Sequence, residues 1–150
     1  MTVHVEGVDL KGTRACAAFN LRRTARAVTQ LYDAGLREAG VRSTQYAILV
    51  AVAKAQPVSV GALAATILID QTTMTRNLKL METDSLIEVS ARGARREKLV
   101  RLSKKGERVL ARATPLWRAV QTRFVDRIGE RRWAELRRAL DDVAMLAAHE

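Results

Sequence analysis

Residues 43–102 change their hydrophobic period once, and this change limits the folds that the chain can adopt. Apolar residues first recur at helical spacing in three short segments, and then alternate as they do in strands. The expected elements are helices at 43–56, 61–67 and 71–83, strands at 86–92 and 98–102, and a basic turn at 93–97. Val58–Val60 is too short for more than a β-bridge.

Longer helices flank this region. We predict one helix over residues 13–38, which is apolar on two sides and therefore needs two packing partners, one of which could be another subunit. Residues 103–147 predict two more helices, with Gly129 between them. Pro115 is expected to kink or break the first of these. Residues 1–12 lack periodicity and are expected to form a loose arm.

The composition fits a single mainly helical α+β domain over residues 1–150. The chain has 26 Lys and Arg against 16 Asp and Glu, a formal net charge of +10, and 48% hydrophobic residues. This is enough for a packed core, and the charge makes a polyanion the first partner to consider. No apolar run exceeds eight residues and no signal peptide is recognisable. We therefore expect a cytoplasmic protein without membrane contact.

Polar residues that can cap helices precede most of the predicted helices. Ser43 or Thr44 can cap the helix at 43–56, and Ser59 can cap the helix at 61–67. Asp70 is a strong N-cap candidate for 71–83, and Ser103 for the helix that follows the strands. These caps indicate where each helix begins.

The helix at 71–83 separates two kinds of side chain. At 100° per residue, Met74, Leu78 and Met81 form one stripe, which would anchor the helix to the domain. Polar side chains that suit phosphates and base edges form the other stripe, about 140° away: Thr72, Thr75, Arg76 and Lys79. A plain amphipathic surface helix would show similar stripes. The short capped helix before it and the basic hairpin after it favour a recognition helix.

Positive charge gathers at the hairpin. Residues 86–112 hold nine Lys or Arg and three acids, whereas residues 113–150 hold seven Arg and six acids. Three helices followed by such a hairpin have the order of a winged helix-turn-helix, and an Arg at the tip can enter a narrow minor groove. The predicted DNA-binding residues are Thr44, Gln71, Thr72, Thr73, Thr75, Arg76, Lys79, Arg92, Arg95, Arg96 and Lys98.

Five stretches in order resemble the MarR family of winged-helix regulators, and the resemblance spans about residues 15–147. They are Ser-Thr-Gln-Tyr at 43–46, Val-Gly-Ala-Leu-Ala at 60–64, Asp-Gln-Thr-Thr-Met-Thr-Arg-Asn-Leu at 70–78, Leu-Ile-Glu-Val at 86–89, and Arg-Arg-Glu-Lys-Leu-Val-Arg-Leu-Ser-Lys-Lys-Gly at 95–106. The resemblance implies a homodimer whose helices at 13–38 and 103–147 interlock. It also implies a pseudo-palindromic operator, usually a repressor role, and in many members release by a phenolic ligand or an oxidant.

The chain departs from the family pattern at two positions in this region. Where the family's wing usually carries Asp, this chain has Ala94, although Arg96 keeps the wing Arg. The glycine that usually precedes the first wing strand is Ser85. Asp84 or Ser85 must therefore make the turn, with left-handed backbone as the expected consequence.

A ligand or redox site is a further hypothesis. A peroxide-sensing branch of the family uses a Cys near the start of the first helix, close to Tyr residues. Here Cys16 stands two residues from that position, a rotation of about 200°. Cys is also commonly a small buried hydrophobe. The candidate ligand or redox residues are Cys16, Phe19, Arg22, Arg26, Tyr32 and Tyr46.

Other function classes receive less support. A thiol enzyme would need a base near Cys16, and His4 and His149 stand near the ends of the chain. We expect no catalytic activity, no metal and no cofactor. Trp117 and Trp133 are expected in the core or an interface. Redox sensing through Cys16 and non-specific binding of nucleic acid stay open beside a dimeric, sequence-specific regulator of double-stranded DNA, with a small-molecule effector as a further partner.

Overall fold

The structure, a computed structural model, describes residues 7–92 and 97–148. The elements are η1 (Thr13–Ala15), α1 (Ala17–Leu36), η2 (Arg37–Ala39), α2 (Ser43–Ala55), β1 (Val58–Ser59), α3 (Val60–Ile67), α4 (Gln71–Thr83), β2 (Ile87–Arg92), β3 (Glu97–Leu102), α5 (Lys104–Ile128) and α6 (Glu130–Ala147). The predicted mainly helical α+β class is therefore confirmed.

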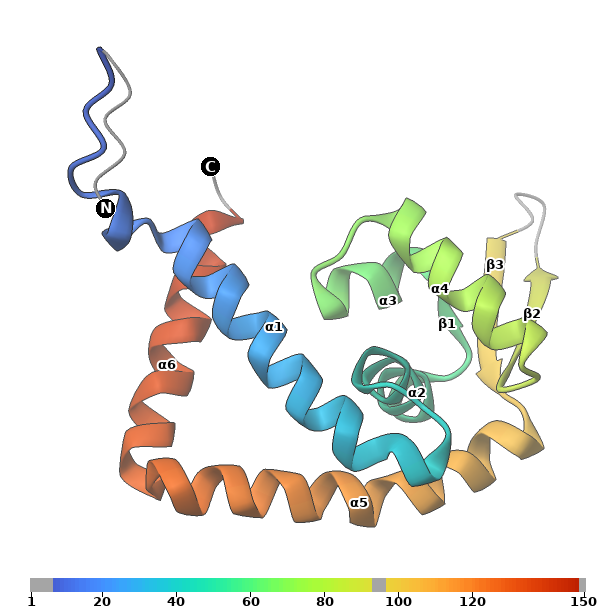
Figure 1. The fold of residues 1–150 in the computed structure, drawn as a ribbon. Coiled ribbons are helices and arrows are strands. Elements are labelled where there is room, and N and C mark those ends of the chain that lie inside the picture. Colours follow the sequence, from blue (N-terminus) through green and yellow to red (C-terminus); the bar gives the residue numbers. More distant parts are fainter. Residues whose placement is uncertain (1–6, 93–96, 149–150) are drawn as a thin grey trace.

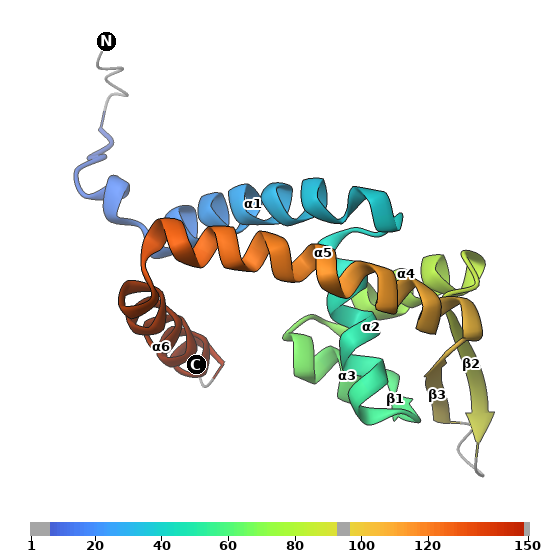
Figure 2. The ribbon, with the colours of Figure 1, turned by 90° about the horizontal axis from the view of Figure 1, so that it is seen from below.

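Two groups of elements lie at opposite ends of the long helix α5 (Figures 1 and 2). Helices α2, α3 and α4 and the small sheet form a lobe at the N-terminal end of α5. Helix α6 turns back at the other end, and α1 packs along α5. None of the helices described over 7–92 and 97–148 is long and apolar enough to cross a bilayer.

The sheet joins the hairpin to the segment that precedes α3. Its strand order is β1-β3-β2, and both pairings are antiparallel. Val100 pairs with Val58 on one side and with Val89 on the other, and its side chain is fully buried. The short β1 thus joins the wing, which is the hairpin of β2 and β3, to the helices of the lobe.

The main core of the lobe is formed by α2, α3, α4, the sheet and the first half of α5. Its fully or almost fully buried side chains include Ile48, Leu49, Val52, Leu63, Met74, Met81 and Val100. Leu36 at the end of α1 belongs to the same cluster. Helix α1 therefore meets the lobe at its C-terminal end.

Three predicted caps are confirmed. Ser59 Oγ accepts a hydrogen bond from the backbone N–H of Ala62, Asp70 Oδ1 accepts one from Thr73, and Ser103 Oγ accepts one from Gly106. The prediction for α2 was wrong, because Arg42 holds the N-cap position and Ser43 is the first helical residue. Ser43 instead donates hydrogen bonds to the carboxylate of Asp33 on α1.

Pro115 does not break α5, which runs without interruption from Lys104 to Ile128. Proline removes one backbone donor, and the helix tolerates this because Pro115 and Ala111, whose carbonyl loses that bond, both lie on an exposed face. Ala113 and Val120 are buried on either side of Pro115 and hold both halves of α5 in place.

The N-terminal end of the chain differs in detail from the prediction. Residues 1–6 lie outside the described part, and residues 7–12 have no regular structure, as expected for an arm. The predicted single helix from residue 13 is a 3-10 turn at Thr13–Ala15 followed by α1, with Cys16 exposed at the N-cap position between them.

The turn from α4 to β2 takes the left-handed backbone that the missing glycine predicts. Ser85 has φ 59°. Side chains at the start of α5 donate hydrogen bonds to two backbone carbonyls of the α4–β2 turn. Ser103 Oγ donates to Ser85 O at 2.6 Å, and Lys105 Nζ donates to Asp84 O at 2.8 Å. Gly106 lies so close that a Cβ there would be 1.9 Å from Leu86 O. The wing and the end of α4 are therefore fixed to α5.

We expect Gly106→Ala to destabilise the protein, because the added methyl meets backbone at Leu86 in a turn that two hydrogen bonds hold in place. Overpacking of this kind costs about 1–3 kcal/mol. Chemical unfolding should show this loss, whereas Arg108→Ala, an exposed change in the next turn, should stay within about 0.5 kcal/mol of wild type. Equal stability of Gly106→Ala and wild type would contradict the close approach.

The cap of α4 predicts a pH-dependent stability. Hydrogen bonds from the side chain and backbone of Thr73 hold the pKa of Asp70 below its ordinary value. A lowered pKa stabilises the fold above the unfolded value of about 3.9, and this gain is lost as pH falls through the folded pKa. The Tm of wild type should exceed that of Asp70→Ala at pH 5–7, and the difference should shrink below about pH 4.

The matched control is Asp70→Ser, which keeps a capping oxygen but does not titrate. Its Tm should exceed that of Asp70→Ala by an amount that does not change with pH. A wild-type advantage that persists unchanged at pH 2.5 would show that the carboxylate charge does not contribute to the cap.

Candidate nucleic-acid interface

Helix α4 is positioned by its turn and its cap. Leu68 has φ 58°, a left-handed conformation that ends α3 and turns the chain toward α4. Asp70 then accepts two hydrogen bonds from Thr73, at 2.8 Å from the backbone N and 2.6 Å from Oγ1. Thr73, one of the predicted DNA-binding residues, thus uses its hydroxyl to fix the start of the helix.

The two predicted stripes of α4 are separated as expected. Met74, Leu78 and Met81 are 0%, 3% and 0% exposed. The opposite side is exposed and carries Gln71, Thr72, Thr75, Arg76 and Lys79. Because the apolar stripe is fully packed, the polar stripe can face only outward.

A groove lies between α4 and the wing. One hollow of about 420 Å³ is lined by Thr75, Leu78, Lys79, Glu82, Val60, Val89 and Lys98. A neighbouring hollow of about 350 Å³ is lined by Ser59, Val60, Gly61, Gln71, Thr75, Glu97 and Lys98. The structure therefore brings together Gln71, Thr75, Lys79 and Lys98, which come from two elements.

Sequence reasoning missed the part of this groove that α3 supplies. The start of α3 lies beside α4, and a Cβ on Gly61 would come within 3.0 Å of Gln71 Nε2. Gly61 was a signal in the sequence, since a glycine inside a short helix indicates a close neighbour. Glu82 and Glu97 also line the groove, and acids there disfavour phosphate on their own side.

The basic groups of the groove are available to a ligand. Among the described residues the ion pairs are Lys104–Glu107 and Arg131–Glu135, so neither Lys79 nor Lys98 is held by an acid. Arg76 is exposed on the same side of α4. The described part of the wing thus adds Lys98 to the charge of α4.

Several predicted contacts cannot be placed on this face. Arg95 and Arg96, with Ala94 of the wing tip, lie outside the described residues, as does the side chain of Arg92. Thr44 is exposed in the first turn of α2, next to α1, whereas the other end of α2 leads to β1 and the groove (Figure 2). The structure does not bring Thr44 to the groove.

The candidate ligand or redox residues do not form one site within the chain. Cys16, Phe19, Arg22 and Arg26 are exposed near the start of α1. Tyr32 lies sixteen residues after Cys16, about 24 Å along the helix. Within one chain, Cys16 and Tyr32 therefore do not line a common pocket, and a ligand or redox site at these residues stays a prediction.

Both tyrosines are packing residues. Tyr46 is 8% exposed and stacks on Trp117 with ring centroids 5.9 Å apart. The Tyr32 hydroxyl donates to Gln121 Oε1, and burial raises the pKa of Tyr32. Its ring meets Phe124 at 6.4 Å, and Phe124 meets Trp133 at 5.4 Å. The stack on Trp117 joins α2 to α5, and the contacts of Phe124 join α1, α5 and α6, so both tryptophans lie in packed positions as expected.

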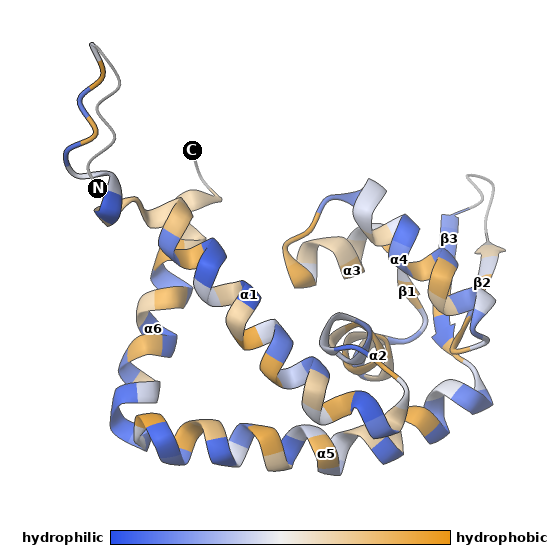
Figure 3. Cartoon of the chain, viewed as in Figure 1, coloured by the Kyte–Doolittle hydropathy of each residue, from blue (hydrophilic) through white to orange (hydrophobic). Residues whose placement is uncertain are grey.

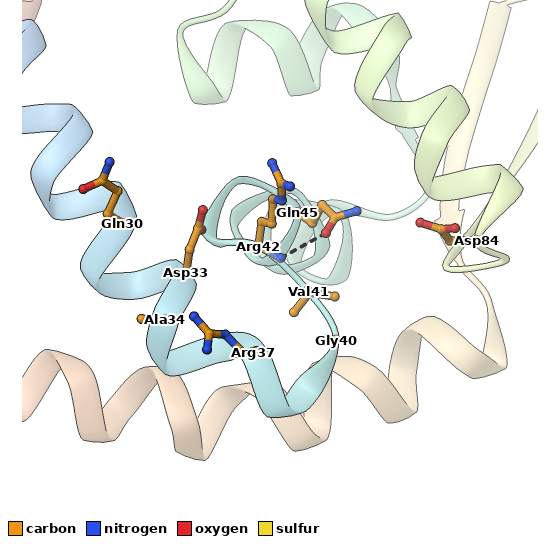
Figure 4. A pocket seen from close by; sticks show the side chains of 9 residues that line it. All are labelled: Gln30, Asp33, Ala34, Arg37, Gly40, Val41, Arg42, Gln45 and Asp84. Atoms are coloured by element: carbon orange, nitrogen blue, oxygen red, sulfur yellow. Dashed lines mark hydrogen bonds between the residues drawn. The ribbon is translucent and has the colours of Figure 1, made fainter.

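A separate polar cavity of about 710 Å³ lies where α1, η2 and the start of α2 meet (Figure 4). Asp33, Arg37 and Arg42 line it together with Gln30, Ala34, Gly40, Val41, Gln45 and Asp84. The guanidinium groups of Arg37 and Arg42 have no ion-pair partner among the described residues. Within that part of the chain, no cluster of His, Cys, Asp and Glu could hold a metal ion.

Comparison with known proteins places this geometry in a family. The family model described as MarR family matches residues 39–97. A search of curated protein sequences gave no significant match. The structure resembles that of the Mycobacterium tuberculosis transcriptional regulator MosR in complex with DNA, with 36% identity, 89% of this chain and 97% of that chain covered, and a TM-score of 0.83.

Two more distant structures share the fold. The transcriptional repressor CouR of Rhodococcus jostii, bound to a 23-mer DNA duplex, is 19% identical over 91% of this chain and 98% of its own, with a TM-score of 0.79. The PcaV regulator of Streptomyces coelicolor, in complex with its natural ligand, is 21% identical over 95% and 99%, with a TM-score of 0.78. From the identity and coverage of the MosR match, together with the family-model match, this chain belongs to the MarR family of transcriptional regulators.

Proposed function

We propose that the protein is a dimeric regulator that binds a specific double-stranded DNA site and represses transcription there. The observation that carries this proposal is the exposed polar stripe of α4 beside the lysine-bearing groove of the wing. The DNA-bound state of MosR and CouR supports it. The site of action would be the chromosome, in the cytoplasm.

In this proposal α4 enters the major groove. Arg76 would donate to the edge of a guanine, as arginine commonly does, while Thr72 and Thr75 contact neighbouring bases or phosphates. Lys79 and Lys98, on the two sides of the groove, would each neutralise a phosphate. The predicted contacts of Arg92, Arg95 and Arg96 would extend this charge along the wing.

A second copy of the chain is the proposed partner of α1 and α6. Helix α6 has no buried residue, and Leu136, Leu140 and Val143 are 42%, 39% and 45% exposed on one side of it. Phe19, Leu21 and Leu31 are also exposed along α1. Figure 3 shows such hydrophobic residues recurring along both helices. A homodimer would bury these faces, as the family resemblance implies.

The dimer sets the shape of the DNA site. Two copies of α4 related by a two-fold axis would face successive major grooves about 34 Å apart. The site would therefore be pseudo-palindromic, with half-sites about one helical turn apart.

We propose release by a small phenolic or anionic ligand, or by an oxidant, as the regulatory step. The complex of PcaV with its natural ligand supports the ligand as an effector. The polar cavity beside Arg37 and Arg42 is a place where an anion would meet two guanidinium groups (Figure 4).

The proposal is tested by salt-titrated binding to three probes: the duplex that flanks the gene, an unrelated duplex of equal length, and a single-stranded RNA. A specific regulator typically prefers its site by about 10³-fold or more. If no preference appears, a selection from genomic fragments separates a distant site from general binding. Similar affinity for every fragment would favour a non-specific nucleic-acid-binding protein. Once a site is known, the same assay screens phenols and peroxides for release.

Arg76→Ala should weaken the specific duplex more than a random one, because it removes a base contact. The expected loss on the specific site is about 1–3 kcal/mol, with a much smaller loss on random DNA. Arg118→Ala, an exposed arginine in the middle of α5, is the matched control and should change neither. An equal loss on both duplexes would refute base reading by Arg76.

Leu140→Glu should weaken the dimer, because it places a charge in the apolar face of α6. Burying a leucine contributes about 1.5–3 kcal/mol, so we expect the dimer Kd in analytical ultracentrifugation to rise roughly tenfold or more. Arg138→Glu, on the opposite side of α6, should leave the dimer nearly unchanged. A wild-type monomer at micromolar concentration would count against the whole proposal.

A further inference from the structure

A carboxylate on α1 caps the start of α2. Asp33 Oδ1 accepts two hydrogen bonds from Ser43, at 2.7 Å from its backbone N and 2.7 Å from its Oγ. Both residues are half-buried, and Asp33 lines the polar cavity, where it lies between α1 and α2 (Figure 4). The contact joins two helices that the turn at η2 and Gly40 brings together.

This cap differs from the others in the chain because it comes from another helix. The first N–H groups of a helix have no acceptor within it, and a negative charge there is favoured by the helix dipole. Ser59, Asp70 and Ser103 each cap the helix that follows them. At α2, Gln45 Oε1 accepts from Arg42 N at 3.0 Å, and the charged acceptor is supplied by Asp33.

The hydrogen bonds between Asp33 and Ser43 also link α1 to the lobe formed by α2, α3, α4 and the sheet. Helix α1 packs along α5, whereas α2 packs on α3 and β3 within the DNA-binding lobe. Over 7–92 and 97–148, no other hydrogen bond joins α1 to the segment 41–102. The contact of α1 with the core of the lobe is apolar and is made by Leu36, and an apolar contact fixes direction less strictly than a hydrogen bond does.

We propose that Asp33 is a positioning residue for DNA recognition, which fixes the lobe to α1 and thereby sets the separation of the two α4 helices in the dimer. It does not contact DNA itself, since it faces Ser43 and lies away from the groove between α4 and the wing. The inference rests on the proposed dimeric, site-specific function, because the separation matters only when two half-sites are bound together.

The charge of Asp33 allows its positioning role to be distinguished from a general electrostatic effect on DNA binding. Removing one acid changes the formal net charge from +10 to +11, and electrostatics alone would then strengthen binding to any DNA. Loss of positioning predicts the opposite on the specific duplex. Glu38 is the matched control, because it is an exposed acid in η2 with no hydrogen bond or ion pair among the described contacts.

The experiment compares full-length Asp33→Ala, Asp33→Asn, Ser43→Ala and Glu38→Ala with wild type. Asp33→Ala should raise the Kd for the specific duplex about five- to tenfold, a typical size for coupling between parts of a protein. Its salt slope should not change, because no phosphate contact is lost. Asp33→Asn keeps an acceptor oxygen and should restore most of the affinity. Ser43→Ala keeps the backbone bond and should lie between them.

Binding to a random duplex separates positioning from charge. Asp33→Ala and Glu38→Ala should both bind it as tightly as wild type or more tightly. If Asp33→Ala also binds the specific duplex as Glu38→Ala does, the inference is overturned. If wild type shows no preference for any duplex, the proposed function fails, and the role of Asp33 fails with it.

A distance measurement tests the geometry without DNA. Spin labels at Thr83→Cys, at the exposed end of α4, in a Cys16→Ser background should give one narrow distance in the wild-type dimer. Asp33→Ala should broaden or shift this distance, and Glu38→Ala should not. A lower Tm for Asp33→Ala with an unchanged distance and an unchanged site preference would show a merely structural role and would also overturn the inference.

Discussion

The burial of one side of α4 is the constraint on which the proposed DNA-binding surface depends. Met74, Leu78 and Met81 are removed from water almost completely, and burying side chains of this kind contributes about 1.5–3 kcal/mol each. Rotating α4 by even one residue would expose this stripe and bury Arg76 or Lys79 without a partner, which costs several kcal/mol. The orientation of the polar stripe therefore follows from the core, and needs no contact made by the polar residues themselves.

Besides the core that it shares with α5 and Leu36, the lobe that holds α4 is hydrogen-bonded both to α5 and to α1. The first turn of α5 holds the turn between α4 and β2 through Ser103 and Lys105, and Gly106 permits the close approach. Asp33 holds the start of α2 from the side of α1. Together with the shared core, these hydrogen bonds to two different helices restrict the rotation of the lobe. The small sheet completes the lobe, because β1 pairs with β3 beside α3.

The features that could be predicted from the sequence were those that depend on residues close to one another along the chain. Ser59, Asp70 and Ser103 cap the helices that follow them, so their roles were visible, and Ser85 took the positive φ that a missing glycine predicts. The prediction for the cap of α2 was wrong, because the charged acceptor at its start, Asp33, lies ten residues away on another helix. Likewise, the closeness of Gly106 to Leu86 depends on how α5 packs against the turn before β2, which no local pattern contains.

Under the proposed function, the contact that covers the exposed apolar faces also determines how far apart the two α4 helices lie. Helix α5 has 25 residues and so spans about 37 Å, with the DNA-binding lobe at one end and α6 at the other. A partner that covers α6 therefore fixes the C-terminal end of α5, and the N-terminal end of the same helix carries the lobe with α4. A second copy would cover Leu136, Leu140 and Val143 and, through the two α5 helices, would place two α4 helices at one defined separation. Under the proposed function, a mutation in α6 and a mutation at Asp33 would thus both alter DNA recognition without either residue lying near DNA.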